Sequence, residues 1–113
     1  MLQDDLGQRR FRRISATNAV LLTRVDGEEV EDLGATRSIG EGGCGVITHE
    51  SLGVDALVRL LISIQQKVVR AMGRVVYEHA IGGGAYEVGV EFLNIGDDEL
   101  EVIETLMEKP ATA

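Results

Sequence analysis

The sequence predicts a small, mainly β domain in which short antiparallel strands form a barrel or sandwich and one helix covers one side. Three observations support this fold class. Apolar and polar residues alternate over Tyr86–Phe92, with the period of a half-buried strand. The chain has 14 glycines and one proline, which favours tight turns and bulges. The clearest helical signals lie near the C-terminus. At 113 residues, the chain is expected to form one domain with its own core.

The first half of the chain is expected to contain an arm followed by three extended segments. Residues 1–14 are polar and charged without periodicity, so we expect a flexible N-terminal arm there. From Thr17 the apolar residues alternate between two faces, and Asp26-Gly27 is a strong turn signal. A second extended segment over about residues 29–39 leads into a glycine-rich turn. Cys44–Thr48 is then predicted to be another short strand.

The stretch Ala56–Ala80 fits two patterns. Its first leucines have helical spacing, but β-branched residues dominate and alternate with other side chains. We favour two strands that turn near residues 65–67. The alternating positions are Val58, Leu60, Ile62 and Ile64, then Val69, Ala71, Gly73, Val75 and Tyr77.

The last elements are a strand and a helix. Gly82–Gly84 predicts a loop or hairpin before the strand at Tyr86–Phe92, which ends at Asn94–Gly96. Asp97–Glu99 places negative charge at a helix start, where the helix dipole favours it, and Lys109-Pro110 marks the end. The expected organisation is an arm over residues 1–14, a barrel with its helix (about 97–108) over residues 15–109, and a tail over residues 110–113.

Charge is distributed unevenly along the chain. Residues 1–24 carry five arginines and two aspartates, a net charge of +3, whereas the rest carries six basic and seventeen acidic residues, a net of -11. Arg9, Arg10, Arg12 and Arg13 fill four of five consecutive positions. Guanidinium groups bind phosphate bidentately and stack on flat rings. This cluster is therefore a candidate anion site, although a solvated terminus also explains it.

The overall composition excludes several classes of function. A net charge of -8 argues against a general nucleic-acid binder, so no DNA partner is expected. Cys44 is the only cysteine, which excludes an intramolecular disulfide and favours a reducing cytoplasm. No run approaches the roughly 18 apolar residues of a spanning helix, so no membrane insertion is expected.

No set of residues predicts catalysis or metal binding. Gly40–Gly45 formally matches G-x-G-x-x-G, but a β-branched strand follows it instead of a helix, so a tight turn or bulge explains it better. His49 and His79 have no partner at metal-ligand spacing. Cys44 fits a small packing residue better than a nucleophile. We therefore expect neither an enzyme nor a cofactor site.

Four segments, in this order, resemble the PilZ domain family. The arginine cluster resembles the R-x-x-x-R motif, with Arg9 and Arg13 at the two arginine positions. Ser38–Val46 aligns with the second motif, D/N-x-S-x-x-G. Gly73–Tyr77 and Tyr86–Phe92 resemble the two late strands of the family.

The resemblance runs from about Gln8 to Glu108 and implies a split-barrel fold with six antiparallel β-strands that binds cyclic di-GMP. It implies no cofactor, and a monomer or weak homodimer that signals to an unidentified effector protein. The arm would fold over the barrel when the ligand binds. The implied ligand-binding residues are Arg9, Arg10, Arg12, Arg13, Ser38, Gly40 and Gly43.

The second motif departs from the family pattern. Ser38 occupies the Asp/Asn position and Gly40 the serine position, so only Gly43 matches. Each lost hydrogen bond to a polar ligand costs about 1–3 kcal/mol, which weakens binding about tenfold to a hundredfold. Two functions therefore stay open: a cyclic di-GMP receptor, or a PilZ-like protein-interaction module that has lost the nucleotide.

Overall fold

The computed structural model of the protein describes residues 12–108. Within that range the chain forms strands and one helix, in an order that agrees with the predicted strands-then-helix pattern. The elements are β1 (Arg13–Ser15), β2 (Ala19–Arg24), β3 (Glu31–Gly40), β4 (Gly43–Thr48), β5 (Leu57–Ile64), β6 (Lys67–Gly82), β7 (Ala85–Ile95) and α2 (Asp97–Glu108).

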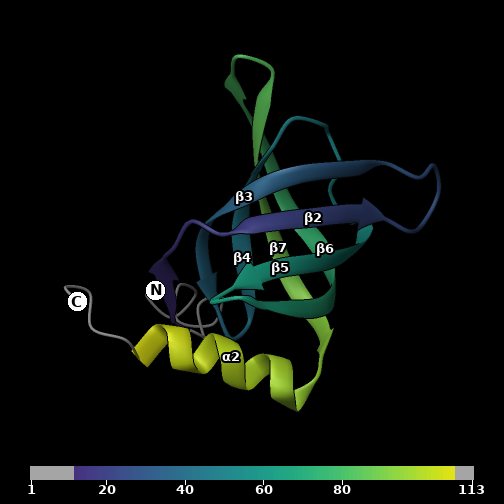
Figure 1. Ribbon diagram of the computed structural model, residues 1–113. Helices are drawn as coiled ribbons and strands as arrows, with labels where there is room; N and C mark the ends of the chain where they lie inside the picture. The colour runs from purple at the N-terminus through teal and green to yellow at the C-terminus, as the bar shows by residue number, and fades with distance from the viewer. Residues whose placement is uncertain (1–11, 109–113) are drawn as a thin grey trace, which may run out of the picture.

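Six strands close into an antiparallel barrel, which confirms the predicted fold class (Figure 1). The order around the barrel is β3-β2-β5-β6-β7-β4, and β4 pairs back with β3 to close it. The additional strand β1 pairs with the end of β3 and begins at Arg13, within the segment that the sequence assigns to the arm. Its three residues are too few for an alternating pattern to predict it.

The ambiguous stretch 56–80 forms the hairpin β5–β6, as favoured from its β-branched residues. Gln65 and Gln66 connect the two strands and both have positive φ, at 52° and 69°. This is the arrangement of a two-residue primed turn, whose twist matches that of the flanking strands. Glutamine is not typical of such a turn, so the position of the hairpin was predictable only from the alternating pattern of the two strands.

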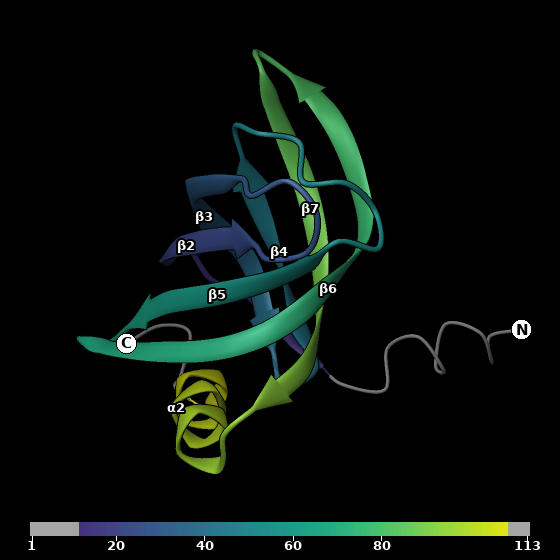
Figure 2. The ribbon, with the colours of Figure 1, turned by 90° about the vertical axis from the view of Figure 1, so that its right-hand side faces the viewer.

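The hairpin β6–β7 extends beyond the barrel (Figures 1 and 2). Gly82, Gly83 and Gly84 form its tip, all with positive φ, which side chains with a β carbon rarely adopt. The predicted glycine loop and the alternating strand after it are confirmed.

The core fills the barrel and continues under the helix. Inward-facing residues of every barrel strand contribute to it, since alternate residues of a strand share a face. Large, fully buried side chains include Val20, Leu22, Ile39, Val46, Leu52, Val58, Leu60, Ile62, Ile64, Val69, Val75 and Ile103.

Helix α2 lies across one end of the barrel, where it contacts β3, β5 and β6 (Figures 1 and 2). Ile103 and Met107 are buried against the core, and Val102 and Leu106 pack beside them. Acidic residues fill its first turn, where their negative charge interacts favourably with the positive end of the helix dipole. The helix predicted over about 97–108 is confirmed. No helix among the described residues has the length and apolarity needed to cross a membrane.

Candidate ligand-binding site

The structure brings the described residues of the two predicted motifs together along β1, β3 and β4. Arg13 is the Cα partner of Gly40, and Ser15 is the partner of Ser38. Gly43 begins β4 directly after the turn that follows β3. The end of the arginine arm therefore lies directly against the second motif. Arg9 and Arg10 lie outside the described residues.

Gly40 allows β1 to approach β3 closely. A β carbon on Gly40 would overlap with the carbonyl oxygen of Arg12 and would lie 3.1 Å from Cγ of Arg13. Backbone atoms cannot move aside as a flexible side chain can, so any side chain here would displace β1. Glycine, in place of the serine of the family pattern, therefore allows the arm to approach the barrel closely at this position.

Gly43 is restricted by the neighbouring strand in the same way. A β carbon on Gly43 would overlap with the carbonyl oxygen of Val90 and would lie 3.1 Å from the carbonyl carbon of that residue. The glycine that matches the family motif thus lets β4 and β7 pack closely at the turn.

Ser38 lies on the outer surface of the barrel, beside a register shift between Thr36 and Ser38. Its hydroxyl lies 3.1 Å from the position that a β carbon on Gly45 would take. Gly45 is in turn the partner of Gly89 on β7. We call this outer surface of β3, β4 and β7 the glycine face; it consists of Ser38, Gly40, Gly43, Gly45 and Gly89.

Tyr77 covers part of the glycine face, a position that the sequence pattern does not predict. A β carbon on Gly89 would lie 2.6 Å from both Cδ2 and Cζ of Tyr77, so the ring lies directly on this glycine. The alternation in the sequence groups Tyr77 with Val75, which points inward. The structure overturns this assignment, because a register shift between Val75 and Tyr77 turns the ring to the outer face.

Two exposed ion pairs flank the glycine face. Arg37 Nη1 lies 3.2 Å from Glu87 Oε1, and Arg74 Nη2 lies 3.0 Å from Glu91 Oε1. Exposed ion pairs contribute little stability. In both pairs the positive charge of the arginine is balanced by the negative charge of the glutamate. Arg13, at the edge of the same face, forms no such pair with another residue between positions 12 and 108.

Cys44 lies in the core under the glycine face. Its side chain is buried, and this burial raises the pKa of the thiol to about 12, against the opposing effect of the Arg13 charge. The thiol is therefore neutral near pH 7 and is not an activated nucleophile. This agrees with its prediction as a packing residue.

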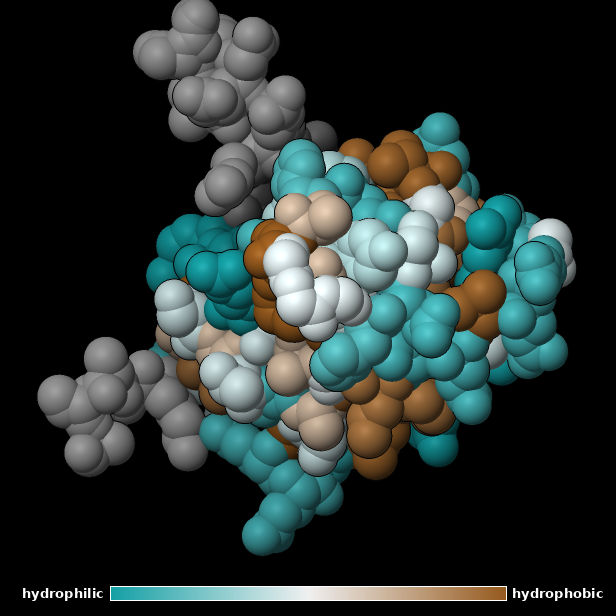
Figure 3. All heavy atoms as spheres, turned by 90° about the horizontal axis from the view of Figure 1, so that it is seen from above, coloured by the Kyte–Doolittle hydropathy of each residue, from teal (hydrophilic) through white to brown (hydrophobic). Residues whose placement is uncertain are grey.

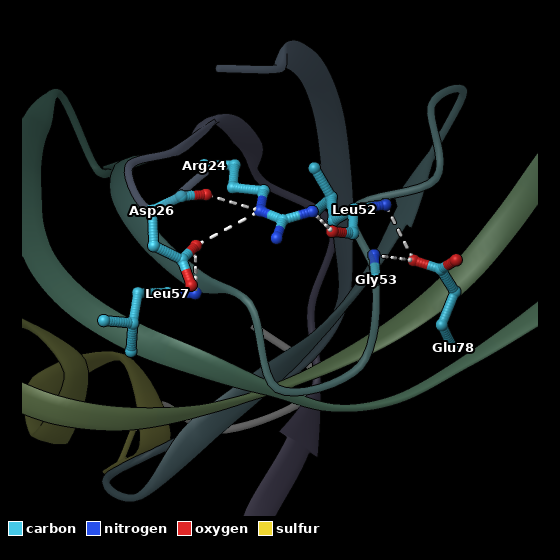
Figure 4. A network of polar contacts seen from close by, with 6 residues as sticks. All are labelled: Arg24, Asp26, Leu52, Gly53, Leu57 and Glu78. Carbon is cyan, nitrogen blue, oxygen red and sulfur yellow. Dashed lines mark hydrogen bonds and ion pairs between the residues drawn. The ribbon is translucent and has the colours of Figure 1, made fainter. Parts of the chain in front are cut away.

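A second polar cluster links Arg24 on β2 and Glu78 on β6 to the loop between β4 and β5 and holds this loop in place (Figure 4). Arg24 Nε donates to the carbonyl oxygen and to Oδ1 of Asp26, at 2.8 Å and 3.1 Å, and Nη1 donates to the Leu52 carbonyl at 3.1 Å. Glu78 Oε1 accepts from the backbone N–H groups of Leu52 and Gly53, at 2.8 Å and 3.1 Å. Both charged side chains, Arg24 and Glu78, form hydrogen bonds with backbone groups of the same chain, which indicates a structural role.

The environment of Glu78 supports this structural role. Burial acts to raise its pKa, but the hydrogen bonds from Ser51, Gly53 and Leu52 outweigh burial and hold the pKa below its usual range. The carboxylate therefore stays ionised as a structural acceptor.

On the end of the barrel opposite α2, hydrophobic residues form small groups separated by hydrophilic ones, without a continuous apolar surface (Figure 3).

A hollow of about 480 Å³ separates the β5–β6 turn from α2. Asp98, Glu99 and Glu101 line it opposite Lys67. Three carboxylates against one ammonium group disfavour a phosphate ligand, because like charges repel most strongly at close range. Electrostatics therefore favours the arginine end of the glycine face for an anionic ligand.

The histidines take no part in a metal site among the described residues. His49 Nδ1 lies 3.7 Å from Asp32 Oδ1, and His79 stacks on Tyr77 with ring centroids 5.1 Å apart. No group of three metal-ligating side chains occurs between residues 12 and 108.

Comparison with known proteins identifies the family. The PilZ domain model matches residues 7–109, which include all four sequence motifs. No curated protein sequence matches the chain.

Solved structures share the fold at low sequence identity. MotI/DgrA, the inhibitor of motility of Bacillus subtilis, is 16% identical with a TM-score of 0.68, over 90% of this chain and 53% of its own. MrkH of K. pneumonia, solved in complex with c-di-GMP, is 19% identical with a TM-score of 0.67, over 88% and 50%. The PilZ domain of YcgR from Escherichia coli, solved with c-di-GMP, is 16% identical with a TM-score of 0.68, over 88% of each chain.

This chain spans about half the length of MotI/DgrA and MrkH, but nearly all of the YcgR domain. At these identities the structural likeness establishes the fold, and the match of the family model over residues 7–109 establishes the relationship. The chain therefore belongs to the PilZ domain family.

Proposed function

We propose that this protein is a non-enzymatic receptor for cyclic di-GMP, which it binds on the glycine face beside the arginine arm. The observation that carries the proposal is the pairing of Arg13 with Gly40, which brings the end of the arm against the second motif. Two PilZ neighbours, MrkH and the YcgR domain, were solved with this ligand.

The chemistry of the site matches a ligand with two phosphates and two guanine bases. Guanidinium groups form charge-assisted bonds to phosphate oxygens and bind guanine O6 and N7 bidentately. We assign phosphate and guanine contacts to Arg9 and Arg13, with Arg10 or Arg12 assisting. The barrel side of the site would consist of the Ser38 hydroxyl and the backbone at Gly40 and Gly43.

Binding would change the surface that another protein meets. A ligand held between the arm and β3 fixes Arg9–Arg13 against the barrel, and a partner can distinguish this state from the ligand-free one. We therefore propose that the protein acts in the cytoplasm through an effector protein that recognises the ligand-bound surface.

Isothermal titration of the purified protein with cyclic di-GMP tests the proposal. We expect saturable binding with a dissociation constant in the micromolar range. Cyclic di-AMP is the matched control, because it presents the same phosphates with a different purine edge. The absence of heat and of competition at about 100 µM cyclic di-GMP, well above the micromolar range, would exclude the receptor function.

A second function is favoured by the altered second motif. Ser38 has a shorter reach than Asp or Asn, and Gly40 offers only its backbone. In this alternative, the protein is a PilZ-like interaction module whose arginines bind an acidic partner protein without nucleotide. Partner binding that does not change with cyclic di-GMP would favour this alternative, whereas micromolar nucleotide binding would exclude it.

A further inference from the structure

An apolar row crosses the outer surface of β3, β2 and β5, which follow one another on the near side of the barrel in Figure 1. Leu33, Leu21 and Leu61 are successive Cα partners there, and we call them the leucine row. None of the three belongs to the core cluster or to the residues packed against it, and Leu33 is 65% exposed. Contiguous apolar side chains on an outer surface, unlike scattered single ones, are typical of an interaction site.

Two exposed residues of opposite charge lie beside the leucine row, two positions along the same strands. Glu31 on β3 and Arg59 on β5 are both Cα partners of Thr23 on β2. Neighbouring strands lie about 4.8 Å apart, so the two charged residues are about 10 Å apart across β2. Neither forms an ion pair with another residue in the described part of the chain. The surface therefore has an acidic side over β3 and a basic side over β5.

This arrangement is complementary to itself. A two-fold axis parallel to β2, between two facing copies, places β3 of one copy over β5 of the other and β2 over β2. Leu33 then faces Leu61 of the second copy, and Leu21 faces its own counterpart. Glu31 faces Arg59 of the second copy, and the symmetry repeats this ion pair on the other side of the axis. All these residues meet at matching heights, because a rotation about an axis along the strands keeps their positions along the strands.

The charges favour a second copy over a partner of a single charge sign. An acidic surface would attract Arg59 and repel Glu31, and a basic surface would do the reverse. A second copy satisfies both charges and covers the leucine row with the same apolar side chains.

We propose that the leucine row, with Glu31 and Arg59, is the interface of a homodimer of this chain. The inference is independent of the receptor function, because no residue of the glycine face belongs to this interface. The outer surface of a barrel is convex, so only three strands of each copy meet. The contact is small, and we expect a dissociation constant of about 0.1–1 mM.

Sedimentation equilibrium of the purified protein from about 10 µM to about 2 mM, without nucleotide, tests the proposal. Leu33→Asp should weaken dimerisation at least about tenfold, because it buries an unpaired carboxylate against Leu61 of the second copy. Leu93→Asp is the matched control: Leu93 is 53% exposed on β7, outside the interface, and its replacement should leave the dissociation constant within about twofold. A wild type that is monomeric at about 2 mM, or a dimer that Leu33→Asp does not weaken, would overturn the proposal.

Exchanging the two charges tests the two-fold arrangement itself. Glu31→Arg and Arg59→Glu should each weaken dimerisation about threefold to tenfold, because each places like charges opposite each other on both sides of the axis. The double variant restores opposite charges and should dimerise within about twofold of the wild type. Failure of the double variant to recover would overturn the pairing of β3 with β5. Urea unfolding at about 10 µM, where the protein is monomeric, checks that each variant is folded.

Discussion

Two parts of the outer barrel surface differ sharply although the strands that form them enclose the same core. On the glycine face, β3, β4 and β7 present Ser38 and glycines, and other groups approach the sheet closely. On the part formed by β2, β3 and β5, which we call the leucine face, Leu21 is the partner of both Leu33 and Leu61. β2 and β5 cross the front of the barrel in Figure 1, whereas β4 and β7 lie behind them.

The difference shows which outer positions restrict the size of a side chain. Leu33 is 65% exposed, and a side chain of almost any kind fits there. At Gly40 and Gly43 a single added carbon would overlap with a carbonyl oxygen of a neighbouring strand. Missing side chains on an outer face therefore mark close approach. On the glycine face, the end of the arginine arm approaches Gly40, β7 approaches Gly43, and the ring of Tyr77 lies on Gly89.

The largest expected effect distinguishes the two faces by charge. Arg13→Ala should weaken cyclic di-GMP binding about tenfold to a hundredfold, because it removes charge-assisted hydrogen bonds worth about 1.5–3 kcal/mol. Arg59→Ala removes an exposed arginine next to the leucine face and should change affinity less than twofold. Calorimetric titration of both variants makes the comparison. Equal losses would mean that only overall charge matters.

The next effect concerns restoring the family serine. Gly40→Ser should destabilise the protein by about 1–3 kcal/mol, because its β carbon would displace β1 at Arg12. Leu33→Ser, on the leucine face, should stay within about 0.5 kcal/mol of the wild type. Urea unfolding measures both. Gly40→Ser with unchanged stability would show that β1 does not lie against β3 as described.

A smaller gain in affinity should follow from the other motif position. Ser38→Asp supplies the longer acceptor of the family pattern without adding bulk at Gly40, so it should strengthen cyclic di-GMP binding about tenfold, or about 1.4 kcal/mol. Ser38→Ala is the matched control and should not strengthen binding. Weaker binding by Ser38→Asp would contradict the assignment of Ser38 to the Asp/Asn position of the ligand-binding motif.

The last effect concerns the core beneath the glycine face and appears only at high pH. Because burial raises the pKa of Cys44 from 9.0 to about 12, folding favours the neutral thiol. The resulting stability is fully present below pH 9 and is lost as the pH rises from about 9 to about 12, by up to about 1.4 kcal/mol per pH unit. Urea unfolding at pH 8 to 10.5 should show a shallower decline for Cys44→Ala than for the wild type. Parallel declines would exclude this linkage.

The sequence predicted the elements that have strong periodic patterns. The strand at Tyr86–Phe92 and the turn near residues 65–67 follow from alternation, and the helix over about 97–108 follows from its apolar spacing and the charge at its start. The number of strands in the barrel came from the family resemblance, because alternation alone does not distinguish a barrel from a sandwich.

The features that the sequence did not predict depend on contacts between distant segments. Strand β1 forms because Gly40 leaves room for the backbone of Arg12, and no local pattern encodes that approach. The orientation of Tyr77 depends on a one-residue bulge at Val76, and a one-residue shift reverses which face a side chain occupies. Gly89 under the ring was visible in the sequence only as a glycine at an outward-facing strand position.

We propose that cyclic di-GMP binds on the glycine face, and mapping of amide chemical shifts by NMR would locate the bound nucleotide residue by residue. Titration with the nucleotide should shift the amide signals of Ser38, Gly40, Gly43, Gly45 and Gly89, while those of Leu21, Leu33 and Leu61 stay in place. Glycine amides resonate in a resolved part of the spectrum, so the face can be followed residue by residue. Shifts confined to the leucine face, or no shifts at about 1 mM nucleotide, would contradict the claim.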